Sequence, residues 1–310
     1  MPFDNLVTRA DAQSLIPDQE VREILKTAVS SSAALQLFRQ IRMSSKMARV
    51  PVLSVLPQAY WVNGDTGLKQ TTDVAWAGKE LVAEEIAVIV PIPEAVLDDA
   101  DYPIWEEIRP NLAEAVGIKL DQAIFSGIDK PATWTAPSVV PGAVAAGNIV
   151  VAGTAGPDEG GVAGDLDALM GLVEEDGYDP SAFAARRGFR SALRQARDTS
   201  GQKLLDVSQD RIEGLPIRYL PPGTLPAGTQ VLTGDFSLGV VGVRQDITYK
   251  MLDQAVISDA AGKIILNLPQ QDSLAMRVVA RFGWTIGDPV TRREAGATGV
   301  AFPFAVMNDA

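Results

Sequence analysis

The chain has 310 residues, no cysteine, no histidine and a formal net charge of −12 at pH 7. Without cysteine or histidine, disulfides, thiolate nucleophiles, zinc fingers and triads with an imidazole base are excluded, although a metal site made of carboxylates alone remains possible. The acidic charge argues against holding nucleic acid through a broad basic surface, and no apolar run is long enough to span a bilayer.

Residues 1–50 differ in charge from the rest of the chain. They contain seven lysines and arginines against five acids, a net charge of +2, so the remainder carries −14. Pro17 and Asp18 can begin a short helix, and residues 1–10 lack a signal-peptide pattern. We expect an arm with short helical pieces that lies on other surfaces, its own or a neighbour's. A disordered leader over the first fifteen residues is the alternative.

The pattern changes to strands between residues 50 and 90. Val50, Val52 and Val55 precede the glycine-containing stretch 63–67, which is typical of a turn, and a second apolar limb follows over residues 74–90. These features predict a long hairpin. Its polar tip has little with which to form a core, so we expect the hairpin to project and to leave strand edges open to another chain.

Apolar residues then recur at spacings of three and four, which predicts one long amphipathic helix. The stripe consists of Ile104, Trp105, Ile108, Leu112, Val116, Leu120 and Ile124. Acidic residues over 94–101 are expected near the helix start, where negative charge suits the dipole. Pro110 predicts a kink or the start of the regular part, and Gly127 is a suitable end.

Residues 130–290 mix helices and strands. One helix is predicted from Asp165, as its cap, to Gly177, and a second from Pro180 and Ser181 through Ala196. Strands are predicted near 139–140 and 148–152, around a turn within 214–220, at 230–233, as a pair over 239–251, and over 274–286. The sequence therefore indicates an α+β protein.

No catalytic constellation is apparent. Adjacent carboxylates occur at Glu84-Glu85, Asp98-Asp99, Glu106-Glu107 and Glu174-Glu175. Acid–base catalysis needs two carboxylates that face one substrate, whereas neighbours in sequence point to different faces, so we interpret these pairs as solvated charge. The glycine-rich stretches 153–156 and 160–164 lack the Lys-Ser/Thr of a phosphate loop and are interpreted as loops.

Arginines recur at helical spacings in one segment. They are Arg186, Arg187, Arg190, Arg194 and Arg197. This spacing predicts a basic helix face, which either contacts an acidic surface of a neighbouring subunit or is simply solvated.

Several short phrases follow one another in order along residues 30–290. They are Ala59-Tyr60-Trp61-Val62 with the tip 63–69, Val90-Pro91-Ile92-Pro93-Glu94 before the long helix, Phe125-Ser126-Gly127, Gly214-Leu215-Pro216-Ile217, Gly234-Asp235-Phe236 and the strand 274–282. In this order they resemble the major capsid proteins of tailed bacteriophages, those with the Hong Kong 97 fold.

The resemblance implies an α+β fold of the Hong Kong 97 type. Its parts would be an N-terminal arm (1–50), an extended loop (51–84), a peripheral domain with a long spine helix (85–133), an axial domain (134–272), and the return strand of the peripheral domain with the C-terminus (273–310). It implies hexamers and pentamers that close into an icosahedral shell around double-stranded DNA. The shell would be assembled in the host cytoplasm and found in the virion.

The partners that the resemblance implies are further copies of the chain, DNA bound without sequence specificity, and separate scaffolding, portal and decoration proteins. It implies no membrane, no cofactor and no enzymatic activity. Inter-subunit contacts are expected at Trp61, Asp65, Lys69, Trp76, Lys79, Arg186, Arg190, Arg194 and Arg197.

Some relatives join a loop lysine covalently to a neighbour's asparagine. Lys69 stands at the loop tip, but the asparagine and the assisting glutamate cannot be matched, so we do not expect this cross-link. Two alternatives stay open: an encapsulin-type shell around a cargo enzyme, and a carboxylate-dependent hydrolase that uses Glu106 or Glu174.

Overall fold

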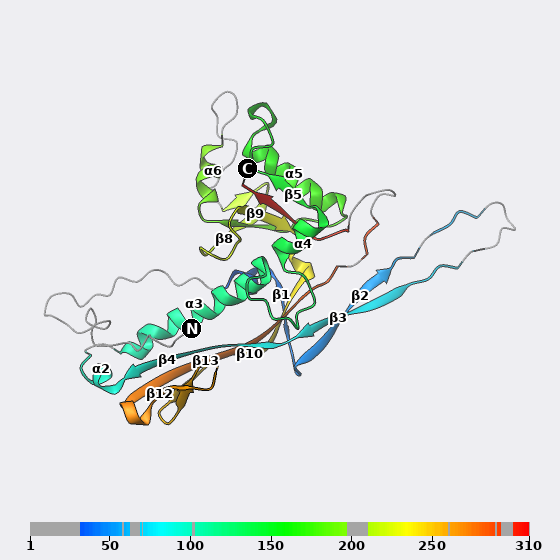
Figure 1. The fold of residues 1–310 in the computed structure, drawn as a ribbon. Helices are drawn as coiled ribbons and strands as arrows, with labels where there is room; N and C mark the ends of the chain where they lie inside the picture. Colours follow the sequence, from blue (N-terminus) through cyan, green and yellow to red (C-terminus); the bar gives the residue numbers. More distant parts are fainter. Residues whose placement is uncertain are drawn as a thin grey trace. The chain divides into compact units, whose positions relative to one another are not determined.

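The computed structural model describes residues 32–310 except positions 58, 63–68, 70, 101–102, 197–209, 260, 289, 293–299 and 310. The helix expected near Pro17, together with Asp65 and Arg197, lies outside the described residues. Among the described residues, one compact unit contains 85–117 and 245–281, and the other contains 32–84, 118–244 and 282–310. Figure 1 labels the helices and strands.

The smaller unit combines strands of one sheet with helices. Its elements are β4 (Glu84–Pro93), α2 (Glu94–Asp98), α3 (Ile104–Asp121), β10 (Gly239–Leu252), β11 (Val256–Ser258), β12 (Ile264–Asn267) and β13 (Ser273–Ile286), of which α3, β4, β10 and β13 continue into the larger unit. The strands adjoin in the order β10-β13-β4. Ile92, Val96 and Ile104 form a buried cluster of this unit. The strand pair predicted over 239–251 is wrong, because β10 is one continuous strand.

The long helix forms as predicted. Helix α3 contains Pro110, continues directly into the π-helix η1 (Gln122–Ser126), and ends at Gly127, whose φ of +73° is left-handed. The expected start is wrong: Glu94 begins the separate helix α2, and the acids of the first turn of α3 are Glu106 and Glu107. The apolar stripe is buried at Ile104, Leu112, Val116, Leu120 and Ile124.

A six-stranded sheet dominates the larger unit (Figure 1). Its order is β5 (Ile149–Val151), β14 (Phe304–Asn308), β9 (Thr229–Gly234), β6 (Ala182–Arg186), β8 (Leu215–Leu220) and β7 (Arg211–Ile212). Helices α5 (Val162–Glu175) and α6 (Phe189–Gln195) pack with strand residues in one core. Leu169 and Val173 come from α5, and Phe189 and Leu193 come from α6, so both helices bury an apolar stripe.

Two short apolar stretches in this sheet region were assigned to the wrong element. Residues 139–140 begin α4 (Val139–Ala146) rather than a strand, and Phe183 lies in strand β6 rather than in a helix. Apolar runs of this length do not separate a strand from a buried helix by periodicity alone.

Asp165 does not cap its own helix. Helix α5 begins three residues earlier, and the Asp165 carboxylate accepts hydrogen bonds from the backbone N–H of Gly153 (2.7 Å) and of Ala155 (2.8 Å). The side chain therefore fixes the loop that precedes α5.

Strand β14 was not predicted from the sequence. It lies inside the six-stranded sheet, antiparallel to β9 and parallel to β5. Phe304, Val306 and Met307 are buried there, so the C-terminal residues complete the core rather than follow it.

An aromatic cluster joins the start of the described chain to this unit. Phe38 is 4% exposed, and its ring centroid lies 4.8–6.0 Å from those of Trp284, Phe236, Phe125 and Phe304. Phe38 follows α1 (Ala33–Leu37) and precedes β1 (Arg39–Arg42), which pairs in parallel with β10. Residues 33–42 of the expected arm are thus built into the subunit.

Candidate assembly surfaces

The predicted hairpin is present. Strands β2 (Met47–Val55) and β3 (Ala75–Val82) pair antiparallel in a two-stranded sheet of their own, from Met47 opposite Val82 to Val55 opposite Ala75. Large apolar side chains remain exposed on it and beyond it: Trp76 is 70% exposed and Trp61 is fully exposed. Isolated pairs of strands are marginal in water, so this one needs support from elsewhere.

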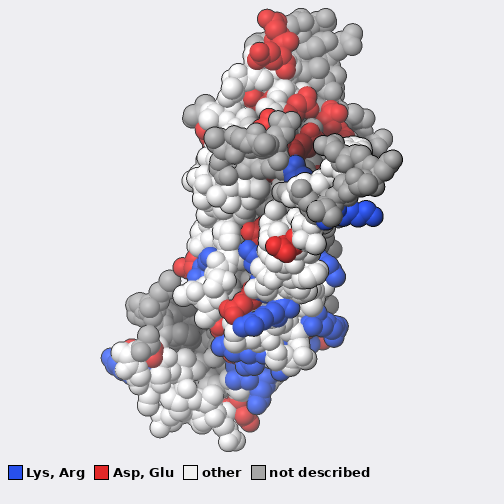
Figure 2. Space-filling view, turned by 90° about the vertical axis from the view of Figure 1, so that its right-hand side faces the viewer, with Lys and Arg blue, Asp and Glu red and all other residues white. Residues whose placement is uncertain are grey.

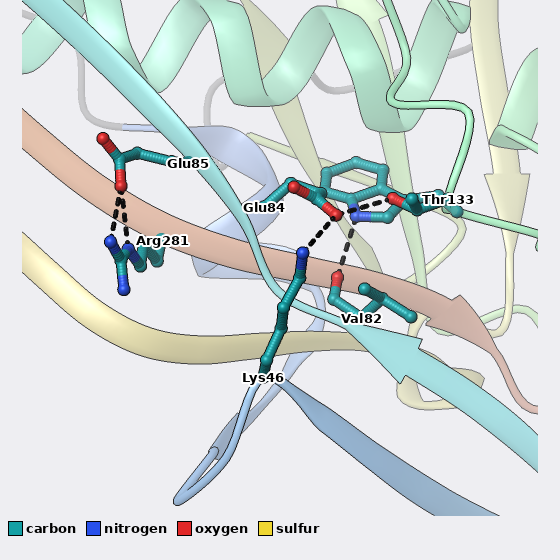
Figure 3. A network of polar contacts seen from close by, with 7 residues as sticks. Lys46, Val82, Glu84, Glu85, Thr133 and Arg281 are labelled. Atoms are coloured by element: carbon teal, nitrogen blue, oxygen red, sulfur yellow. Dashed lines mark hydrogen bonds and ion pairs between the residues drawn. The ribbon is translucent and has the colours of Figure 1, made fainter.

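The base of the hairpin is fixed within the subunit. Leu81 is fully buried against Met43 and Val240, and the Trp134 indole N–H donates a 2.9 Å hydrogen bond to the backbone oxygen of Val82 (Figure 3). A Cβ at Gly283 would lie 2.8 Å from that same oxygen, so the strand approaches as closely as glycine allows. The hairpin is therefore held at one end and exposed towards the other.

Glu84 and Glu85, the adjacent carboxylates after the hairpin, each have their own partners. Glu84 pairs with Lys46 at 3.5 Å and accepts a 2.9 Å hydrogen bond from the Thr133 hydroxyl, as Figure 3 shows. Glu85 receives two hydrogen bonds from the Arg281 guanidinium, at 2.7 and 2.9 Å. The two carboxylates act separately, so they do not form an acid–base dyad.

Lys79, expected at an inter-subunit contact, pairs with Asp288 of its own chain, with 2.6 Å between the ammonium nitrogen and a carboxylate oxygen. Arg49 pairs across the hairpin with Glu80 at 3.4 Å. Both pairs are substantially exposed, and such pairs contribute about 0–1 kcal/mol to stability. Lys69 is exposed near the tip of the hairpin.

The arginines do not form one helix face. Arg186 is the last residue of β6 and Arg187 lies in the turn, whereas Arg190 and Arg194 are in α6. The helix begins only at Phe189, because the chain is extended in β6 up to Arg186. The side chains still occur within one short segment of the surface, and Arg187, Arg190 and Arg194 are exposed.

Arg190 packs against Tyr219. Its guanidinium lies 5.3 Å from the centre of the phenol ring and donates a 3.2 Å hydrogen bond to Asp210. Burial raises the pKa of the Tyr219 hydroxyl, against the opposing charge of Arg190.

A buried carboxylate, which the sequence analysis did not single out, fixes the start of the described chain. Asp121 accepts hydrogen bonds from the Ser32 hydroxyl (2.6 Å) and from the backbone N–H groups of Ala33 (2.8 Å) and Ala34 (2.9 Å). Burial raises the pKa of Asp121 above its usual value, although the three donors oppose this effect. Its position at the end of α3 was readable from the sequence, but its partners lie almost ninety residues away.

The described residues contain no cluster of three or more carboxylates that could hold a metal ion. Within the same part of the chain, every helix is too short or too polar to cross a membrane.

The fold matches solved structures along nearly the whole chain. A chain of Microbacterium phage Oxtober96 is 37% identical, with a TM-score of 0.83, and the match covers 98% of this chain and 99% of that one. A chain of Mycobacterium phage Cain is 33% identical, also with a TM-score of 0.83, over 98% of each chain. The fold defines a phage capsid protein of the Hong Kong 97 type, as the sequence predicted.

The model of the phage capsid family matches residues 12–290, and the chain belongs to this family. The major capsid protein of Staphylococcus phage 80alpha is 26% identical over 288 residues, which are 92% of this chain and 86% of that protein. The chain is thus a major capsid protein, the repeating subunit of an icosahedral phage shell and a component of the virion. The comparisons favour this function over an encapsulin-type shell and over a hydrolase.

Proposed function

We propose that copies of this chain first form hexameric and pentameric rings, and that the rings close into a shell around double-stranded DNA. A contact that repeats by rotation generates a closed ring. Rings of six and rings of five subunits together generate a closed shell. The subunit would act through association alone, without catalysis. Our assignments of the arm (1–50), extended loop (51–84), peripheral domain (85–133 with 273–310) and axial domain (134–272) belong to this proposal.

The observation that carries the proposal is the exposed end of the β2–β3 hairpin. The hairpin is anchored through Leu81 and Val82, yet it leaves Trp76 and Trp61 in water. An aromatic side chain removes roughly 150–250 Å² from water when it is buried, so exposing two has a substantial cost to an isolated subunit. Contact with a neighbouring copy would remove this cost.

The charge of the chain fits a container for DNA rather than a DNA-binding protein. At −12, the subunit repels the phosphate backbone on average, so packaged DNA would be enclosed without sequence-specific contacts. Assembly would take place in the host cytoplasm. Separate scaffolding, portal and decoration proteins would complete the particle.

The proposal can be tested with the purified chain. Negative-stain electron microscopy and sedimentation should show rings or closed shells, and Trp76→Ala should lower the assembled fraction while circular dichroism of the subunit stays unchanged. Val62→Ala provides a control for a smaller exposed side chain in the same loop. A chain that stays monomeric at high concentration would refute ring formation. DNA extracted from particles made in infected cells, in place of a cargo enzyme, would separate the phage shell from an encapsulin-type shell.

A further inference from the structure

Charges are strongly segregated along the part of the chain that builds the six-stranded sheet. Residues 131–185 contain eight acidic residues and no lysine or arginine, a net charge of −8. Residues 186–218 contain eight lysines and arginines against four acids, a net charge of +4. A solvated surface without a partner gains nothing from such segregation, since interspersed charges keep a protein equally soluble.

The fold places the two segments towards opposite ends of one sheet. Helix α5, from the acidic segment, contacts β5, β14 and β9, whereas α6, from the basic segment, contacts β6. Because the sheet order is β5-β14-β9-β6-β8-β7, α5 lies towards the β5 end and α6 towards the β7 end. Figure 1 shows α6 to the left and α5 to the right.

We call the exposed carboxylates of α5, which are Asp167, Glu174 and Glu175, the acidic face. Asp167 and Glu174 are seven residues apart, so they lie on one side of the helix, and Glu175 lies on the adjoining side. The other carboxylates of the segment include Asp165 and Asp176, which are buried and bound by backbone amides, so they are not available to a partner. In Figure 2 acidic side chains gather at the top of the view.

We call Arg187, Arg190 and Arg194 the basic ridge. Next to it is a cavity of about 470 Å³, lined by Arg186, Arg187 and Gly188 and, across from them, by the end of β8 and the residues that follow it, Leu220, Pro221, Pro222, Gly223, Leu225 and Ala227. The recess combines guanidinium groups with apolar walls. A neighbouring carboxylate that entered the recess would be partly shielded from water, and this shielding would strengthen its attraction to arginine.

We propose that the basic ridge of one copy contacts the acidic face of the next copy around each ring. The inference rests on the proposed formation of rings and names the two surfaces that meet in them. Because the two surfaces lie towards opposite ends of the sheet, a two-fold contact centred on either surface alone would bring like charges together, whereas a head-to-tail contact pairs opposite charges.

The test uses two variants of the full chain. In one, Arg187→Glu and Arg194→Glu reverse the basic ridge; in the other, Glu174→Arg and Glu175→Arg reverse the acidic face. Each variant alone brings like charges together, so we expect the assembled fraction in sedimentation to fall by at least about tenfold at low salt. The chain that carries all four changes regains opposite charges at every contact and should assemble again.

Mixing the two variants in equal amounts gives a sharper result. The two kinds of subunit must alternate around a ring, which a hexamer permits and a pentamer does not. The mixture should therefore form hexamers and their extended lattices, and electron microscopy should find few closed shells. Failure of both the mixture and the four-change chain to assemble would show that the two surfaces do not face each other.

Two controls make the outcomes distinguishable. Lys250→Glu with Lys263→Glu changes the net charge as much as the ridge reversal, but on the other unit, and should leave the intact ring contact unchanged. Should a reversed variant fail to fold by circular dichroism, replacing the same residues by glutamine should weaken the salt dependence of assembly. Normal assembly of both reversed variants overturns this inference alone, whereas a wild-type chain without rings overturns the proposed function.

Discussion

Asp121→Asn is the sharpest test of the packing around the start of the described chain. The carboxylate is fully buried, and all three of its donors need an acceptor. If the asparagine oxygen takes over the hydrogen bonds of Ser32 and Ala34, its NH₂ group must face the N–H of Ala33. Two donors then meet in a buried position, which costs about 1–3 kcal/mol of the free energy of unfolding.

The pH dependence of this effect has a definite sign. Burial raises the pKa of Asp121 above 3.8, its value in an unfolded chain, so between the two values the folded state binds more protons than the unfolded state. The free energy of unfolding of the wild type therefore falls as pH rises through that window. Asparagine does not titrate, so the advantage of the wild type over the variant should grow as pH is lowered through the raised pKa of Asp121 towards 3.8.

Urea denaturation of unassembled subunits, followed by tryptophan fluorescence at several pH values, measures this difference directly. All other titrating groups are shared, so they cancel in the comparison. An advantage that shrinks with falling pH would show that the three hydrogen bonds outweigh burial and that the pKa of Asp121 is lowered. A variant as stable as the wild type at every pH would refute the structural role assigned to the carboxylate.

Two further predictions concern side chains with contrasting surroundings. Trp76→Ala should leave the free energy of unfolding of the isolated subunit within about 0.5 kcal/mol of the wild type, because Trp76 is exposed. Trp134 is buried, so Trp134→Ala should lower the free energy of unfolding by about 3–5 kcal/mol. Urea denaturation of the two variants measures both values, and equal losses would contradict the burial pattern. Gly239→Ala places a Cβ 2.2 Å from the Phe38 ring and should cost about 1–3 kcal/mol, while Gly171→Ala, which meets nothing within 4 Å inside α5, should raise the melting temperature slightly.

Much of the fold was predictable from periodicity. The long helix needs only its own apolar stripe and Gly127, and the hairpin needs only two limbs and a turn, so both were found. Errors occurred where tertiary contacts decide. Val139 starts a helix within a run too short to show its period, and Asp165 binds a loop that precedes its helix rather than capping its own N-terminus.

The candidate assembly surfaces were only partly predictable. Exposure of Trp61 and Trp76 agrees with their assignment to contacts, which stays a prediction, whereas the partner of Lys79 lies more than two hundred residues away and no local pattern indicates it. The segregation of charge is visible in the sequence. The sequence does not show where the two charged segments lie in the fold. The order of the strands does, because it places α5 and α6 towards opposite ends of the sheet.

The position of β14 has a consequence for the timing of synthesis. In the part of the chain that the structure describes, β5 joins the rest of its sheet only through β14, so the sheet stays in two pieces until residue 308 has left the ribosome. Domains generally fold as units while the chain emerges, and this sheet cannot be completed before β14 appears. Nascent chains on one messenger therefore cannot present a finished sheet to their neighbours until Asn308 has emerged, which delays their association.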